Sequence, residues 1–420
     1  MRIPNVLRDG RCAAWVPWLC GLLAAAIAAR SLVGAYCDFG IYLDVAREFR
    51  AGGFDIYRDR IEVGPWLYPH VAVLPFVALD AVFGDAGSRW VWSLLLGLGT
   101  ALLLRDTSRA LRAFGGLRWW QWLAFGVLFQ RCLAQNLTHG QLSLLVGVFV
   151  AGGVVHLQQQ RDRRAGAWFA IAAALKLTPV LFLPALPLMR RPRAAAAMLV
   201  ATAAAVLLVP LPFCGLAEHL RHLGDFWRTV SGVLSPAGPT GQMSMHAGPS
   251  ISGTLDYLLQ PTPFDLDGHT VNVLSLGDSS LRLVKLAWSA FVGGLLLAWF
   301  WLARRHPEPQ RLALQSAAVM LAMLFFTPLV RVLHLATAML PFALFCRGPR
   351  DRRDGLWWAV ATAMLFAMTL RQKNLIGATL WRTLDGGGLL HFALVAMLIW
   401  LVRATRYTAP PRCNAGSASV

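Results

Sequence analysis

The sequence predicts an all-α protein that crosses a membrane as about 11–12 helices. The first reason is composition: the 420 residues are 57% hydrophobic and 14% charged, whereas soluble domains are about 45–50% apolar and about 25% charged. The second reason is pattern, because the apolar residues gather in runs of roughly 15–23, near the length at which a helix crosses a bilayer. A closed β-barrel needs alternating polar and apolar residues, which these runs lack.

The predicted membrane segments are the apolar runs 12–33, 69–83, 88–104, 119–136, 141–157, 166–189, 194–213, 283–303, 312–328, 333–346, 355–370 and 388–402. Basic segments connect many of them, and the formal net charge is +18. Arg and Lys concentrate on the cytoplasmic side of membrane proteins. We therefore expect a multi-pass protein of the plasma (cytoplasmic) membrane with both termini in the cytoplasm. The placement of the charge between apolar runs argues against nucleic acid as a partner.

Two of these segments have unusual features. Segment 166–189 carries Lys176 and Pro179 near its middle, so we expect two short helices that meet near the outer half of the membrane. Runs 69–83 and 88–104 lie between an outer loop and a basic inner loop, so only one of them should cross. The first is short and contains Asp80, which favours a re-entrant or interfacial position.

Two stretches, 34–68 and 214–282, are too polar to span a membrane and are expected on the outer face. In the first, Phe39–Arg50 carries apolar residues at helical spacing, which predicts a helix lying on the membrane plane. The second is rich in Gly, Pro and Ser, and loops of that length are usually functional lids or disordered. We expect one membrane domain over 1–420, with a disordered tail at 408–420.

Two charged residues are the strongest candidates for chemistry. Asp38 follows the first apolar run; it is either a solvated loop acid, a helix N-cap, or a general base that activates an acceptor hydroxyl. Lys176 lies inside an apolar segment, where a cation is costly and usually faces a partner or a pathway. It either snorkels to the interface or binds an anion such as a phosphate.

Further polar residues flank the predicted outer turns. Arg331 and His334 lie between two apolar runs, and His139 lies at the turn after run 119–136. Each is either interfacial or, with Lys176, part of a cationic pocket for a phosphate. The sequence has no GxxxxGKS loop, no HExxH motif and no nucleotide-binding domain. A transferase on this chain would therefore take its activated group from a lipid carrier, and we expect no cofactor and no metal.

A series of short motifs, in order over roughly residues 12 to 346, resembles glycosyltransferase family 87, a family of multi-pass GT-C enzymes. The motifs are Asp38-Phe39-x-x-Tyr42-x-x-x-Ala46, Ala51-Gly52-Gly53, Ile56-Tyr57, Tyr68-Pro69, Gly140-Gln141-x-Ser143-Leu144-Leu145, Ala172–Pro179 before Arg190-Arg191, and Thr327-Pro328 with His334 before Leu340-Pro341. Departures from the family pattern are His70, Ser143, Arg331, Leu333 and the absence of an Asn-Gln pair before the Ser in Ser250-Ile251-Ser252-Gly253.

The resemblance implies a GT-C-like fold with an outer-face active site. It also implies transfer of a sugar, typically mannose, from a polyprenyl-phosphate donor to a glycolipid or glycan, with inversion and without a metal. Asp38 matches the family's presumed base, Lys176 a residue suited to the donor phosphate, and His334 lies near the late-turn His. The matched outer motifs add Tyr42, Gln141 and Ser250 as substrate-binding candidates, beside Arg331 and His139. The alternatives are a transporter or flippase of a lipid-linked sugar and a catalytically degenerate member of the family.

Overall fold

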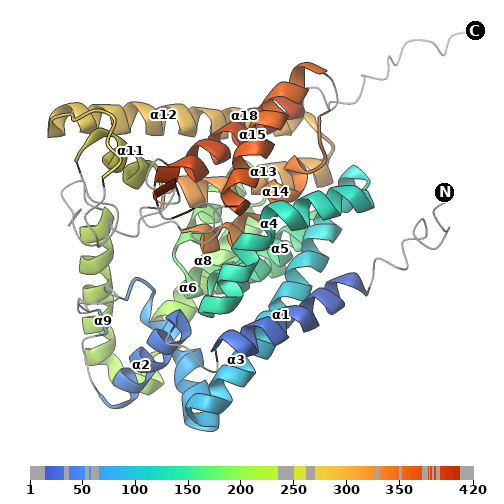
Figure 1. Cartoon of the computed structure of the whole chain (residues 1–420). Coiled ribbons are helices and arrows are strands. Elements are labelled where there is room, and N and C mark those ends of the chain that lie inside the picture. The colour runs from blue at the N-terminus through green and yellow to red at the C-terminus, as the bar shows by residue number, and fades with distance from the viewer. Residues whose placement is uncertain are drawn as a thin grey trace, which may run out of the picture.

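The protein is built from helices throughout the part of the chain that the structure describes. The computed structural model describes residues 15–32, 37–52, 56–57, 66–234, 250–261, 270–327, 331–349, 352–370, 377, 379–380, 383–384 and 388–406. Within these ranges every regular element is an α-helix or a 3₁₀-helix (Figure 1). The predicted all-α fold class is confirmed. The predicted tail 408–420 and the loop stretches 235–249 and 262–269 lie outside the described residues.

The elements in chain order are α1 (Val16–Leu32), α2 (Asp38–Arg50), η3 (His70–Val73), α3 (Leu74–Leu111), η4 (Arg112–Phe114), α4 (Trp119–His139), α5 (Ser143–Gln158), α6 (Asp162–Leu175), η5 (Thr178–Leu181), α7 (Phe182–Leu188), α8 (Pro192–Leu207), α9 (Leu211–Leu234), α11 (Ile251–Leu259), α12 (Asp278–Leu302), η6 (Ala303–Arg305), α13 (Glu308–Phe325), η7 (Val332–Ala338), α14 (Met339–Phe345), α15 (Arg352–Leu370) and α18 (Leu389–Arg406).

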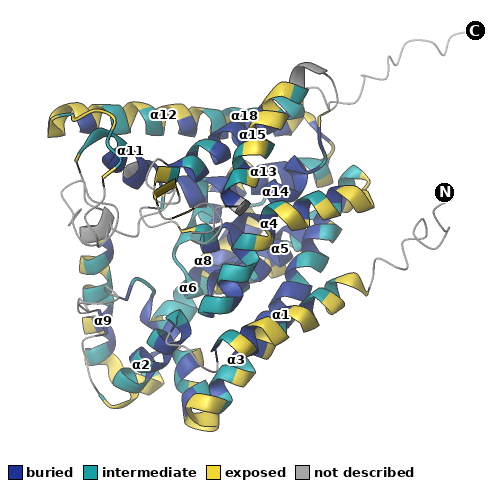
Figure 2. Cartoon of the chain, in the orientation of Figure 1, coloured by how far each residue is buried: buried dark blue, intermediate teal, exposed yellow. Residues whose placement is uncertain are grey.

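Several of these helices are suited to a bilayer. By length and composition, three described segments could each cross a membrane alone: His70–Phe114, Asp278–Arg305 and Leu389–Arg406. A bent pair, Pro192–Leu207 with Leu211–Ser231, is a fourth candidate, and five apolar helices of 10–17 residues accompany them. Among the described residues, fewer helices than the 11–12 expected pass this joint test of length and composition, and several apolar runs fold as shorter or broken helices. Exposed leucines on α1 and α12 give the bundle an apolar outer surface (Figure 2), which is typical of a lipid-facing side.

The basic connections gather at one end of the bundle, which we call the basic face. It is held by contacts between distant connections: Gln158 donates to the carbonyls of Ala110 (3.0 Å) and Pro309 (2.9 Å), and Arg191 pairs with Asp162 at 3.2 Å and with Glu308. Prediction placed these connections on the same side of a membrane. Their contacts in the structure confirm that they share one end.

The predicted break within 166–189 is confirmed. Helix α6 ends at Leu175, Lys176 adopts an extended conformation (φ −152°, ψ 131°), and η5 begins at Thr178 before α7. Pro179 explains the break, because it lacks the N–H that would continue the helical hydrogen bonds and it clashes with the preceding turn. Lys176 therefore leaves the helix at the negative end of its dipole, where a cation is favoured.

The two apolar runs 69–83 and 88–104 form one element, α3, interrupted at Gly84. This glycine has φ 62° and ψ −172°, a conformation that side chains with a Cβ rarely adopt. Asp80 lies before the break and is buried, with its carboxylate bound by Arg47 at 2.8 Å and Arg50 at 3.3 Å. The two runs therefore differ in role: the first forms ion pairs with α2, and the second continues into the bundle.

Helix α2 forms where the spacing of Phe39, Tyr42, Leu43 and Ala46 predicts it. All four side chains are buried, and Phe39 stacks on Trp92 with ring centroids 5.3 Å apart. The apolar face of this helix therefore covers protein, against the start of α3, instead of lying on lipid as expected. Amphipathic spacing identifies a buried face, but it does not tell lipid from protein.

The first third of the predicted loop 214–282 is a regular helix, α9, and that part of the loop prediction is wrong. The chain turns by 91° between α8 and α9, so α9 runs across the end of the bundle (Figure 1). Its exposed side carries Leu216, Leu220 and Trp227, spaced as successive turns of one helical face. Composition suggested a loop, whereas this apolar stripe is the pattern of a helix that lies at an interface.

Candidate functional site

The turn between α4 and α5 brings residues from three regions together. Gly140 ends α4 with φ 69°, and a Cβ at this position would lie 2.6 Å from Cβ of Phe39. Its carbonyl accepts a hydrogen bond from Nε1 of Trp92 at 2.9 Å. Only glycine meets both demands, a left-handed conformation and a close approach. The turn therefore lies directly against the first turn of α2, where Asp38 is located.

Asp38 is the first residue of α2, and its half-buried carboxylate is held from the α4–α5 turn. Nε2 of Gln141 donates to its Oδ2, and the Tyr42 hydroxyl donates to Oε1 of Gln141 at 3.1 Å. The helix N-cap is Cys37, which makes no side-chain cap, so the N-cap interpretation of Asp38 is wrong. Asp38 instead carries negative charge in the first turn of α2, where the helix dipole favours an anion.

Aromatic residues form one wall of this site. The Tyr42 ring lies 5.7 Å from Trp66 and 6.1 Å from Tyr68, and the last two rings are 4.9 Å apart. The Tyr57 hydroxyl donates to the Tyr68 carbonyl at 3.2 Å and anchors this stretch. Burial raises the pKa of the Tyr42 phenol well above its usual range, so Tyr42 remains a neutral hydrogen-bond donor to Gln141.

Lys176 points into the protein. Its Nζ donates to Oγ of Ser143 at 3.1 Å and lies 5.9 Å from the centre of the Tyr68 ring. Asp38 is within electrostatic reach of this ammonium group. An inward hydrogen bond to Ser143 contradicts snorkelling, the alternative for this residue. The site thus contains a carboxylate held by Gln141 and an ammonium group held by Ser143, two residues along the chain.

The late turn contributes Arg331 at the edge. Its side chain is exposed and interacts electrostatically with Tyr68, which brings it near the aromatic wall. Its backbone N–H donates to Nδ1 of His334 at 3.0 Å, so the imidazole caps η7. Asn136 of α4 holds this turn by donating to the Leu333 carbonyl at 2.6 Å.

Two other candidate residues have local structural roles. Nδ1 of His139 lies 3.0 Å from the Gln135 carbonyl and 3.1 Å from Oγ1 of Thr138, within its own helix end. Ser250 is buried and caps α11, where its hydroxyl accepts a hydrogen bond from the Gly253 amide at 3.0 Å. The structure thus groups Asp38 with Tyr42, Gln141 and Lys176, and it gives His139 and Ser250 other partners.

Sequence analysis missed the group that fixes α2 in place. Arg47 bridges Asp80 at 2.8 Å and Asp85 at 3.0 Å, and it thereby ties the helix that carries Asp38 to α3. The signal was present, because an acid within an apolar run needs a cationic partner. It also missed Trp66, whose contact with Tyr42 depends on the folded chain.

Among the described residues, no group of His, Cys, Asp or Glu is arranged to hold a metal ion; metal independence stays a prediction.

Comparison with known families settles the class of the protein. Residues 66–330 match the family model described as glycosyltransferase family 87. The chain belongs to this family. The family assignment agrees with the resemblance that the motifs carry. The matched range contains Tyr68, Gln141 and Lys176, whereas Asp38 and Tyr42 precede it.

Two solved structures are similar in fold to this family 87 chain. The oligosaccharyltransferase of Archaeoglobus fulgidus, in the apo form, has a TM-score of 0.44 at 10% identity, over 95% of this chain and 57% of its own. ArnT from Cupriavidus metallidurans, in the apo state, has a TM-score of 0.38 at 14% identity, over 94% of this chain and 76% of its own. This chain thus spans little more than half of the oligosaccharyltransferase. A search of curated proteins finds no match.

Proposed function

We propose that this glycosyltransferase moves a sugar, most simply mannose, from a polyprenyl-phosphate donor to a hydroxyl of a glycolipid or glycan. The observation that carries the proposal is that the start of α5 and its preceding turn hold both charges: Gln141 binds Asp38, and Ser143, two residues on, binds Lys176. A transfer between two oxygen atoms needs a base for the incoming hydroxyl and a cation for the departing phosphate. Asp38 and Lys176 supply one of each within a single site.

The proposed reaction is a single displacement with inversion. Asp38 takes the proton of the acceptor hydroxyl as that oxygen forms a bond to C1 of the sugar. The bond between C1 and the phosphate oxygen breaks at the same time, and polyprenyl phosphate leaves with the electron pair. Gln141 orients the carboxylate through Oδ2, and Tyr42 in turn fixes the amide of Gln141. This support keeps the base in one rotamer, as general-base catalysis requires.

Lys176 is the group proposed to stabilise the leaving phosphate. It donates to Ser143 in the structure, and an ammonium group has three donors, so it can bind a phosphate oxygen and keep the bond to Ser143. Arg331, exposed beside Tyr68, is placed to add a second positive charge from the rim. The donor's lipid tail would then lie along the apolar surface of the bundle.

We propose that the site faces the outer side of the membrane, since it lies at the opposite end of α5 from the basic face.

The decisive experiment compares Asp38→Asn with Asp44→Asn, a carboxylate on the same helix whose side chain is 47% exposed. Both proteins are assayed in membranes with radiolabelled polyprenyl-phosphate mannose and total membrane acceptors. Asp38→Asn should lower the rate of transfer by about 10²–10⁴-fold, the usual contribution of a general base. Asp44→Asn should stay within about twofold of wild type, as expected for a surface substitution.

Protein abundance and insertion must be equal in all samples, as measured by quantitative immunoblotting after carbonate washing. Transfer that persists in Asp38→Asn would contradict Asp38 as the base, while wild-type activity would still support the donor. A wild type that is inactive with mannose is tested again with other polyprenyl-phosphate sugars. Inactivity with every such donor would contradict the proposed donor class, and the labelled product of an active reaction identifies the acceptor.

A further inference from the structure

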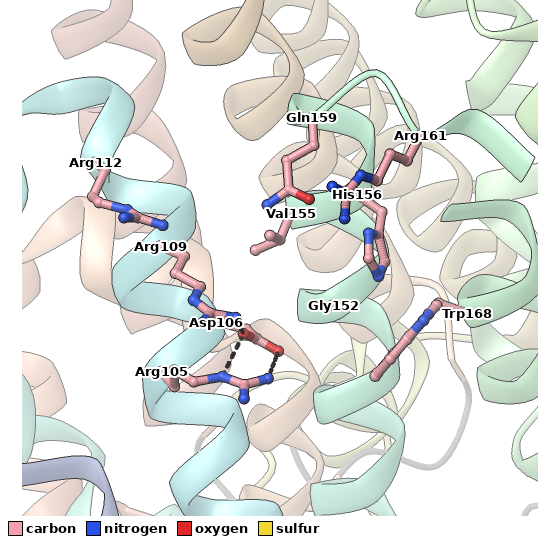
Figure 3. A pocket seen from close by; sticks show the side chains of 10 residues that line it. All are labelled: Arg105, Asp106, Arg109, Arg112, Gly152, Val155, His156, Gln159, Arg161 and Trp168. Carbon is pink, nitrogen blue, oxygen red and sulfur yellow. Dashed lines mark hydrogen bonds and ion pairs between the residues drawn. The ribbon is translucent and has the colours of Figure 1, made fainter. Parts of the chain in front are cut away.

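A polar cavity lies at the basic face, far from Asp38. Its volume is about 410 Å³, and its walls come from the end of α3 and η4 on one side and from α5 and α6 on the other (Figure 3). Ser143 at one end of α5 binds Lys176, and His156 near the other end lines this cavity. Thirteen residues separate the two, which is about 20 Å along a helix. The cavity is therefore a separate site.

The cavity is strongly positive. Four guanidinium groups line it, and one carboxylate, that of Asp106, faces them. Asp106 is already bound by Arg105 at 2.9 Å and by Arg109 at 3.3 Å. Arg112 and Arg161, which come from opposite walls, make no ion pair with a carboxylate in the part of the chain that the structure describes. Two guanidinium groups thus remain available for an anion.

The wall formed by α5 and α6 is shaped for a ligand as well. The Trp168 ring lies flat against α5 because Gly152 has no side chain; a Cβ there would lie 2.6 Å from the ring. The ring of His156 lies 5.7 Å from the Trp168 ring, and Nδ1 of His156 is buried without a hydrogen-bond partner. Both rings line the cavity together with the arginines, so the site offers aromatic as well as charged walls.

Arginines that only set membrane orientation need no cavity, no fixed aromatic wall and no unsatisfied imidazole. Guanidinium groups from two walls match the oxygens of a phosphate, which they bind with paired hydrogen bonds. The volume suits a small headgroup, and basic pockets between helices at a cytoplasmic surface bind anionic lipid headgroups.

We propose that this cavity binds the phosphate group of an anionic ligand, held between Arg112 and Arg161 with Trp168 as its wall. The site is independent of the proposed sugar transfer. A bound phosphate would join α3 to α6 and offset the repulsion among the arginines. The same chemistry is presented by an anionic lipid headgroup and by a soluble phosphate compound, and binding measurements separate these two sources.

The test uses the full-length protein in detergent and native mass spectrometry with three probes: dihexanoyl phosphatidylglycerol, dihexanoyl phosphatidylcholine and inorganic phosphate. Arg112→Ala with Arg161→Ala is compared with Arg193→Ala with Arg305→Ala, which removes two exposed basic side chains outside the cavity. The first pair should weaken phosphatidylglycerol binding by about tenfold or more, since hydrogen bonds to charged groups are the stronger ones. The second pair should change it by less than about twofold.

The probes then identify the source of the phosphate. Binding of phosphatidylglycerol above phosphatidylcholine supports a lipid headgroup, whereas equal binding of inorganic phosphate supports a soluble compound. Arg112→Lys with Arg161→Lys keeps both charges and should retain part of the affinity, even if the alanine pair folds poorly. The proposal is overturned if neither phosphatidylglycerol nor inorganic phosphate binds wild type, or if the alanine pair and its control bind equally well the anionic probe that wild type binds.

Discussion

Helices α2 and α9 are both amphipathic and both lie near the Asp38 end of the bundle, yet only α2 turns its apolar face toward the protein. The apolar side of α2 is buried in protein, where Phe39 and Leu43 are fully covered. The apolar side of α9 is exposed, with Leu220 58% and Trp227 70% accessible. Helix α9 buries two imidazoles, those of His219 and His222, besides Val230. A helical hydrophobic pattern therefore shows that a helix has an apolar face and a polar face. Whether the apolar face contacts protein depends on the neighbouring parts of the chain.

The polar contacts of the two helices differ in the same way. Helix α2 is tied to α3 by charged pairs, in which Arg47 reaches Asp80 and Asp85. Helix α9 is tied to η3 through imidazoles, since Nδ1 of His219 lies 2.8 Å from Nε2 of His70. The helix that carries Asp38 is thus fixed by packing and charge. Helix α9 contacts η3 through polar groups. Its apolar stripe is exposed, and a bilayer would cover it.

The largest expected effect of this difference is on stability. Phe39→Ala should lower the free energy of unfolding by about 3–5 kcal/mol, because it opens a cavity in a packed core. Leu220→Ala, on the exposed face of α9, should change it by less than about 1 kcal/mol. Unfolding in mixed detergent micelles measures both. Equal losses would show that α9 is packed as tightly as α2.

A second, smaller effect concerns the charged anchor of α2. Asp80→Ala leaves Arg47 and Arg50 without their shared carboxylate and should lower the free energy of unfolding by about 1–3 kcal/mol. Asp85→Ala is the matched control, since its side chain is 47% exposed against 7% for Asp80. Exposed pairs contribute about 0–1 kcal/mol. A loss for Asp85→Ala as large as that for Asp80→Ala would contradict the assignment of Asp80 as the anchor.

The smallest effect on unfolding is expected for the stripe of α9. Replacing Leu216, Leu220 and Trp227 together with Ser should leave the unfolding free energy in detergent within about 1 kcal/mol of wild type. In bilayers the same change should expose α9, because an interfacial helix binds through its buried apolar area. Hydrogen exchange of α9 in nanodiscs, compared with detergent, detects this. Unchanged protection in nanodiscs would contradict a lipid environment for the stripe.

Features set by local sequence were predictable, and features set by distant contacts were not. The break at Lys176 follows from Pro179, four residues after the helix ends, and helix α2 follows from its own spacing. The orientation of α2 depends on Phe76 and Trp92 of α3, which its own residues do not specify. Helix α9 was missed because the composition of the whole loop outweighed a stripe of about three turns.

The site shows the same division. Asp38 and Lys176 stood out as charges beside or within apolar runs, and the motifs added Gln141 and Tyr42. The hydrogen bond between Gln141 and Asp38 joins residues 103 positions apart, so no local pattern could show it. His139 and Ser250 carried the right chemistry at the right turns, but they satisfy their own helix ends. A helix terminus needs such polar groups whether or not a substrate binds nearby.

Gly140 limits how this enzyme can vary. A methyl group there would push against Phe39, and Phe39 is the neighbour of Asp38 along the chain. Any larger residue at position 140 would therefore shift the carboxylate together with the helix, and it would also disturb Gln141, the residue that aims it. In a library that samples every amino acid at this turn, we expect selection for sugar transfer to return glycine alone.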